Sequence, residues 1–264
     1  MSLLYASMSG MHSPQTYREE ARAKGVPEHA IDLALSLALP QAELTPSDKD
    51  GGVLVGRYGG LPSLPEGVEW DNGLDLVATV DCAALPPDTC DLPLPRDGHL
   101  LFFADRTDPD GFTLMHDSRS VIHVQAGTPT TERTLPENHF PALDPHPLYA
   151  RTFPSLPMTA DDAVLPHPEI RRLYDEYELE HLDQRLPQWD ESLHLGGYAY
   201  SPQDPPIMGS SPEDEKGGWV LLAQTQFDMP DDPGFTACVF WIIQRDELAA
   251  GNFAAAGLVS ISYH

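Results

Sequence analysis

The sequence predicts an α+β fold made of two related halves, with flanking helices and a helical segment at the N-terminus. Three observations support this prediction. Helical patterns precede Pro40. After that residue, glycines and prolines separate short runs of valine, leucine and phenylalanine, which is typical of strands and turns. One arrangement of glycines and strands then occurs twice along the chain, and such a repeat indicates an internal duplication.

Each copy of the repeat has a glycine pair, an apolar strand and a second strand that ends in aromatic residues. The first copy contains Gly59 and Gly60, residues 76–80 and residues 100–103; the second contains Gly196 and Gly197, residues 220–223 and residues 238–241. Gly196 follows Gly59 by 137 residues, Leu221 follows Leu76 by 145, and Cys238 follows Leu100 by 138. One insertion and one compensating deletion therefore align the two copies.

The repeat also predicts how the chain is divided. We expect an N-terminal helical segment at residues 1–45 and one domain at residues 46–264, whose halves (about 46–127 and 190–264) are joined by a proline-rich linker and an amphipathic helix. The linker is placed at residues 128–168 because nine prolines are too many for regular structure there. A chain of 264 residues is near the upper limit for one core, so one domain or two fused lobes both fit.

Helix signals mark three segments. Ser13 and Pro14 predict the start of a helix that Gly25 ends. Residues 28–39 are apolar on more than one face, so we expect this helix to be buried or to contact another chain. Residues 168–186 carry an apolar stripe opposite acidic residues, which predicts a surface helix.

Strand signals fill most of the remaining chain. Residues 97–117 predict a hairpin with its turn at residues 108–111, and a further strand is expected at residues 120–125. After the second copy of the repeat, we expect a helical turn at residues 244–253 and a last strand at residues 258–263.

The acidic composition excludes some partners. With 15 basic and 41 acidic residues the net charge is −26, which disfavours nucleic acids and anionic membranes. The charge fits simple solubility, or attraction to a basic partner or a cation. The three cysteines include no CxxC pair, so neither a disulfide framework nor a thiolate zinc site is indicated. Because the N-terminus lacks signal-peptide features and no segment approaches the ~20 apolar residues of a membrane span, we expect a cytoplasmic protein.

The motifs do not establish a catalytic or metal site. The aspartates before Gly111 resemble a calcium loop, but Arg106 occupies the place of the first ligand. Glu178 and His181 form an ExxH pair, yet a di-iron site needs a second such pair. The sequence has no GxSxG motif, and its glycine pairs precede strands rather than helices. Catalytic residues are therefore unknown, and we expect no metal and no cofactor.

Polar and aromatic residues beside the repeated strands are the candidate ligand-binding residues. They are Tyr58, Trp70, Tyr198, Gln203, Trp219 and Gln224, with Tyr200 close by. Two halves that face each other would bring such loops together in a cleft, a common place for ligands. The alternative is that the aromatic residues belong to the core or cap it. Gln224 is the strongest candidate, because it interrupts an apolar strand. A buried amide there needs hydrogen-bond partners, which a ligand or a peptide could supply.

The same segments resemble the YwqG-like family of bacterial proteins of unknown function. GGLPSLPEGVEW, the strand ending at Asp81 and GHLLFF are similar to its first half; HLGGYAYSPQDP, WVLLAQTQFD and CVFWIIQRDELAAGNF are similar to its second. The likeness spans roughly residues 52–253 and implies a duplicated α+β fold with mainly antiparallel sheets. It implies no reaction. Members are similar to proteins found in bacterial toxin and immunity gene neighbourhoods, which implies binding rather than turnover.

The chain departs from that family at three places. Asp71 stands where a proline is usual, and Thr79 stands where glutamine is typical. Residues 227–237 lack the consecutive tryptophan, glycine, aspartate stretch that normally precedes the last strand of the core in that family. If the family glutamines line a shared site, only Gln203 and Gln224 remain, so the second half is the better place to search.

These observations favour a non-catalytic cytoplasmic protein that binds a basic protein or peptide, an immunity-type protein being one form. The alternative is an enzyme that tailors a peptide or small metabolite in the cleft between the halves, and a small-molecule ligand remains open. A third hypothesis is a scaffold that forms oligomers through the helix at residues 28–39.

Overall fold

The computed structural model describes residues 14–48, 51–70, 73–106, 119–137, 140–156, 172, 176, 191–200, 218–228 and 236–263. The first elements are α1 (Pro14–Ala23), α2 (Glu28–Ser36), β1 (Leu39–Thr45), β2 (Val53–Tyr58), β3 (Ser63–Pro65), β4 (Asp75–Asp81), β5 (His99–Ala104) and β6 (Val121–Val124). They are followed by β7 (Thr130–Glu132), β8 (His146–Ser155), β9 (Leu193–Leu195), β10 (Trp219–Asp228), β11 (Thr236–Gln244), α5 (Arg245–Ala249), the 3-10 turn η2 (Phe253–Ala255) and β12 (Gly257–Tyr263).

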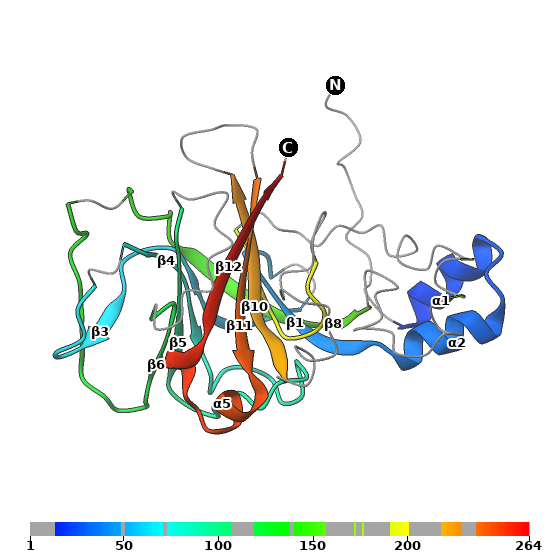
Figure 1. Ribbon diagram of the computed structural model, residues 1–264, viewed down its shortest axis with the longest axis horizontal. Helices are drawn as coiled ribbons and strands as arrows, with labels where there is room; N and C mark the ends of the chain where they lie inside the picture. Colours follow the sequence, from blue (N-terminus) through cyan, green and yellow to red (C-terminus); the bar gives the residue numbers. More distant parts are fainter. Residues whose placement is uncertain are drawn as a thin grey trace.

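Ten of these strands form a single sheet, in the order β12-β11-β10-β9-β1-β8-β2-β4-β5-β6. Each described strand pair is antiparallel, and β3 and β7 form a separate two-stranded sheet. The large sheet curls into a half-barrel (Figure 1). Its central runs, such as TACVFWIIQ in β11, are apolar at successive positions because both faces are buried.

The predicted α+β class with flanking helices is wrong, because the fold is mainly β. Figure 1 shows α1 and α2 beyond one end of the sheet instead of layered on a face. The curl explains why the sheet needs no helical layer: its concave face packs on itself. Phe102 on β5 and Trp241 on β11 are separated by six strands in the sheet, yet their rings meet edge to face with centroids 5.3 Å apart. The Trp241 indole N–H also donates to the carbonyl oxygen of Phe103 at 2.9 Å.

The N-terminal helices pack mainly on each other. Their apolar faces form a small core from Tyr17, Ala21, Val26, Ala30, Ile31 and Ala34. Arg18 pairs with Glu28 and with Asp32, the latter at 2.7 Å. The helix predicted at residues 28–39 ends at Ser36, and its last predicted residue begins β1. The helix predicted at residues 168–186 lies outside the described residues except for Arg172 and Glu176, which are helical and form an i, i+4 ion pair.

The proline-rich linker contains a strand that the sequence did not predict. Residues 146–155 form β8, which lies in the middle of the sheet between β1 and β2. Pro147 and Pro154 sit near its two ends, where a missing N–H disturbs the ladder least. Likewise, the last seven residues of the predicted N-terminal helical segment form β1. Of the predicted hairpin, β5 is the first strand, and the second lies outside the described residues.

The sequence repeat is also a repeat of strand pairing. Gly59 N donates to Val77 O at 2.7 Å, and in the second copy Gly196 N donates to Leu222 O at 3.2 Å. The β4–β5 register shifts between Leu76 and Ala78, and the β10–β11 register shifts between Leu221 and Ala223. Both copies therefore have the same bulge in the same place. All four glycines of the pairs have φ between 61° and 78°, a region that favours glycine.

The pairing register corrects one predicted offset. Ala78 lies opposite Phe102, and Ala223 lies opposite Trp241, so Trp241 is the counterpart of Phe102 and follows it by 139 residues. The sequence alignment had placed this strand at an offset of 138. A one-residue slip turns every side chain of a strand to the other face, so the correction matters.

The two halves interlock through one strand each. β1 precedes the first half in sequence but pairs with β9 of the second, whereas β8 precedes the second half but pairs with β2 of the first. β1 and β8 then pair with each other over seven positions, with Thr45 opposite Tyr149. The halves thus share one continuous sheet. The predicted domain limits at residues 45, 127 and 190 stay predictions.

Candidate functional site

The predicted residues of the second half gather at one place. Gln224 on β10 is 1% exposed, and its side-chain oxygen accepts a hydrogen bond from Tyr200 N at 2.9 Å. Tyr198 N donates to Ser155 Oγ at 2.9 Å, and the Tyr198 hydroxyl donates to Leu37 O at 2.8 Å. Burial raises the pKa of both tyrosine hydroxyls. These polar groups bond to the protein itself, and Gln203 lies outside the described residues.

The other predicted residues lie in two separate surroundings, the main core for Tyr58 and Trp70 and a second apolar cluster for Trp219. Tyr58 is buried in the main core and stacks on His146, with ring centroids 5.0 Å apart. Trp70 is buried too, and its indole N–H donates to Leu74 O at 2.8 Å. Trp219 packs against the apolar cluster on the other face of β10–β12. The structure therefore does not bring the six predicted residues into one site.

A row of polar side chains crosses the sheet where the halves meet. Arg151 on β8 lies opposite Glu43 on β1, Glu43 lies opposite His194 on β9, and His194 lies opposite Gln224 on β10. Glu43 and His194 are 3% and 1% exposed, so a charge or an imidazole there depends on partners inside the protein. Arg151 Nη2 supplies one of them, at 2.8 Å from Glu43 Oε2.

Gln41 extends this polar row and orients the imidazole. Its amide Nε2 donates to Gly196 O at 2.7 Å, and its Oε1 lies 3.2 Å from His194 Nδ1. Since Oε1 can only accept, Nδ1 carries the proton. The row ties the glycine pair of the second copy to β1 and β9. Sequence reasoning missed four members of the row, Gln41, Glu43, Arg151 and His194. His194 has a local signal, as a polar residue between two leucines, whereas β1 and β8 carry several polar residues each.

The first half has different chemistry at the corresponding positions. Arg57 lies opposite Thr79 as His194 lies opposite Gln224, so Arg57 and Thr79 are the counterparts of the histidine and the glutamine. Arg57 Nη2 donates to Leu61 O at 2.9 Å. The imidazole and amide of the polar row thus occur in the second half only.

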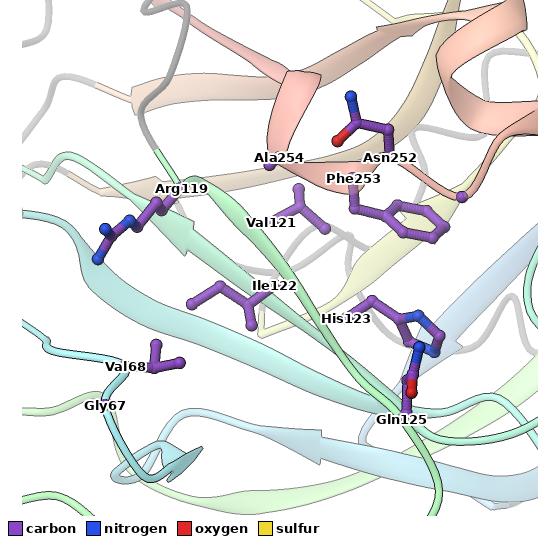
Figure 2. Close-up of a pocket in the computed structure, with 11 residues that line it drawn as sticks. Gly67, Val68, Arg119, Val121, Ile122, His123, Gln125, Asn252, Phe253 and Ala254 are labelled. Atoms are coloured by element: carbon purple, nitrogen blue, oxygen red, sulfur yellow. The ribbon is translucent and has the colours of Figure 1, made fainter. Parts of the chain in front are cut away.

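An open groove lies at the other end of the sheet, next to β6 (Figure 2). Its volume is about 450 Å³, and its lining residues come from the loop after β3, from β6 and from the turn before β12. Val68 and Ile122 line one part, and His123 and Phe253 line another, with the two rings 5.5 Å apart. We call it the β6 groove. It lies between residues of both halves, but none of the five predicted ligand-binding residues that the structure describes lines it.

The chain matches the model of one protein family over most of its length. The model of a domain of unknown function, DUF1963, matches residues 56–259, which is most of the chain. The chain belongs to the DUF1963 family. A comparison with curated proteins found no match.

The DUF1963 domain includes the β6 groove and most of the polar row. The match begins within β2 and ends within β12, so Arg151, His194 and Gln224 lie inside it. Gln41 and Glu43 precede the matched region, although β1 is a central strand of the sheet. The family description assigns no activity to either site.

Charged residues of both signs lie near the β6 groove of this DUF1963 domain. Glu66 and Glu69 are exposed and flank the lining residues Gly67 and Val68 in the chain. On the opposite side, Glu247 Oε2 accepts a hydrogen bond from the lining residue Asn252 at 2.7 Å. Arg119 lines the groove at one end of β6, and the guanidinium of Arg133 donates to the carbonyl oxygens of Pro65 and Val68. The lining is therefore partly apolar and partly polar, with Arg119 as its charged residue, and the carboxylates of Glu66, Glu69 and Glu247, here called the rim carboxylates, belong to residues that adjoin or bond to lining residues.

Other chemistry has little support in the described part of the chain. Burial raises the pKa of Cys82 to about 12 and that of Cys90 to about 11, so both thiols stay protonated at neutral pH. No group of three histidine, cysteine, aspartate or glutamate side chains is placed to hold a metal ion among those residues. None of the helices described is long and apolar enough to cross a membrane.

Proposed function

We propose that this DUF1963 domain is a non-catalytic binding protein for a basic protein or peptide, which it binds at the β6 groove. The observation that carries the proposal is an open groove with three carboxylates next to its lining residues, in a chain of net charge −26. Such a potential attracts cations and speeds their association. The motifs that resemble YwqG-like proteins agree with binding, an immunity-type protein being one form.

The polar row supports a structural role for the residues first considered as ligand contacts. Gln41, Glu43 and Gln224 are buried, and their side chains bond to other parts of the sheet. A ligand would have to displace these bonds. The β6 groove is open, so a partner can reach it without rearrangement.

A defined peptide tests this proposal. The probe is a peptide of alternating lysine and valine, and its matched control replaces each lysine by glutamate. We expect the lysine peptide to bind, the glutamate peptide not to bind, and the affinity to fall with added salt, because exposed charges are screened. Isothermal titration or fluorescence anisotropy measures the affinity. Equal affinities for the lysine peptide and the glutamate peptide would contradict the proposal.

Charge removal locates the site. The variant Glu66→Gln/Glu69→Gln removes two rim carboxylates, and Glu19→Gln/Asp48→Asn removes two exposed carboxylates from α1 and from the end of β1. Exposed ion pairs contribute up to about 1 kcal/mol each, so the rim variant should bind the lysine peptide roughly three- to ten-fold more weakly. The control variant should bind almost as the wild type does. Equal losses in both would mean that the groove is not the site.

A further inference from the structure

β6 is an edge strand with open main-chain groups. It is the last strand of the sheet and pairs with β5 on one side. Phe103 N donates to Ser120 O at 2.8 Å, and hydrogen-bonded positions alternate along an antiparallel pair. Ile122 and Val124 therefore bond to β5, whereas the N–H and C=O groups of Val121 and His123 point away from it. In the described part of the chain these outward groups have no backbone partner.

The β6 groove follows this edge. Side chains alternate across a strand, and Val121, Ile122 and His123 all line the groove. In Figure 2, Val121 and His123 lie toward Phe253, whereas Ile122 lies toward Val68. A groove lined from both faces of an edge strand leaves room beside its backbone. An added strand would place its own alternating side chains toward Phe253 and toward Val68.

The net charge of the protein favours a basic segment as the strand that pairs with β6. A second copy of this chain would bring another net charge of −26 to the same edge, and the two copies would repel each other. A basic segment is attracted by the net charge of −26, to which the rim carboxylates contribute. Arg119 lies next to β6 at its start, so the basic residues of the segment belong away from that end.

We propose that β6 binds an extended basic segment of the partner as an additional β-strand. This inference rests on the proposed function and specifies how the partner is recognised. Two outward N–H and two outward C=O groups, from Val121 and His123, would pair with the main chain of the segment, as in other complexes formed by strand addition. Recognition would then depend on extended backbone and positive charge more than on one side-chain sequence.

The first test removes one outward donor. Val121→Pro deletes an N–H that does not bond to β5, and edge strands tolerate proline. Thr130→Pro is the matched control, because Arg133 N bonds to Pro62 O and Thr130 is thereby an outward position of the other small sheet. We expect Val121→Pro to bind the lysine–valine peptide about ten-fold more weakly, the loss of one main-chain hydrogen bond. Thr130→Pro should bind it as the wild type does.

The second test changes the peptide and leaves the protein intact. The same lysine–valine peptide with every amide N-methylated keeps its charge and side chains but cannot donate main-chain hydrogen bonds. We expect its affinity to fall at least ten-fold. Hydrogen exchange of the wild-type protein adds a readout that needs no variant. The amides of Val121 and His123 should exchange at least ten-fold more slowly when the unmethylated peptide is bound, whereas that of Ile122, already bonded to β5, should change little.

The outcomes separate the two proposals. If the N-methylated peptide binds as well as the parent, or if exchange at Val121 and His123 is unchanged, strand addition is overturned. The proposed function survives that result where Glu66→Gln/Glu69→Gln still weakens binding. If the unmethylated peptide binds to no part of the wild-type protein, both proposals are overturned.

Discussion

Replacing Trp241 by phenylalanine tests whether the curl of the sheet is held by contacts between its two arms. Trp241 is fully buried, stacks edge to face on Phe102 and donates to Phe103 O at 2.9 Å, so it joins β11 to β5. Phenylalanine keeps most of the apolar contact. It leaves the Phe103 carbonyl without this donor, at a cost of about 1–3 kcal/mol, and a small void adds about 1 kcal/mol. We expect the free energy of unfolding to fall by about 2–4 kcal/mol.

Trp70→Phe is the matched control for this prediction. Trp70 is also buried and donates its indole N–H to a carbonyl, but the acceptor is Leu74, four residues away. Loss of this hydrogen bond disturbs one loop, so we expect the free energy of unfolding to fall by about 1 kcal/mol. Urea denaturation followed by circular dichroism measures both variants, provided that the slope with urea is unchanged. If Trp241→Phe is no more destabilising than Trp70→Phe, the contact between the arms does not stabilise the curl.

Three further predictions concern the polar row, the glycine pair and the thiols. Glu43→Ala leaves the Arg151 guanidinium without its buried carboxylate and should lower the free energy of unfolding by about 3 kcal/mol in urea denaturation, whereas a near-neutral result would show that the row is dispensable. Gly197→Ala places a Cβ 2.8 Å from the side-chain amide of Gln41 at a φ of +70° and should lower the melting temperature far more than Gly127→Ala, whose Cβ meets nothing within 4 Å at a φ of +78°. Because the folded protein holds the thiol pKa of Cys82 near 12 and of Cys90 near 11, above the unfolded value of 9.0, their contribution to stability is complete below pH 9 and is lost as pH rises toward those values. Iodoacetamide should therefore label the native protein slowly at pH 8 and the urea-unfolded protein quickly; equal rates would contradict the raised pKa values.

Local patterns predicted the strands that the repeat contains. β4, β5, β10 and β11 lie where apolar runs and glycine pairs placed them, because such runs have few other ways to be buried. The predicted offset of 138 between β5 and β11 was wrong by one residue, because the two strands correspond at 139. The apolar runs of β5 and β11 match each other at an offset of 138 or of 139, so the sequences alone do not fix the register, whereas the pairing of Ala223 with Trp241 does.

The strands that join the halves could not be predicted from local pattern. β8 carries two prolines, and β1 follows directly after a helix, so each sequence resembles a linker or a helix end. What makes them strands is their pairing with each other and with β2 and β9, which are distant in the chain. The predicted fold class failed for the same reason, since the curl that makes a helical layer unnecessary depends on the whole sheet.

Sequence reasoning found one member of the polar row and missed the β6 groove. Gln224 was conspicuous because it is an amide in an apolar strand, but its cross-strand neighbours His194 and Glu43 come from segments whose register was unknown. The groove has an even weaker signal. Val68, Ile122 and Phe253 are ordinary apolar residues, and only the assembled sheet shows that they surround an open edge.

The duplication explains why the sites of the two halves differ. Interlocked strands place the junction of the halves in the middle of the sheet, where Arg151 pairs with Glu43 and His194 bonds to Gln41. An accessible site forms more easily where the two arms of the half-barrel approach each other. Its residues then come from the last strand of one half and from the turn before the last strand of the other. The β6 groove has this composition: Val121 and His123 come from the first half, and Asn252 and Phe253 come from the second. The middle of the sheet thus joins the two halves, whereas the edge that we propose for binding lies at one end of it.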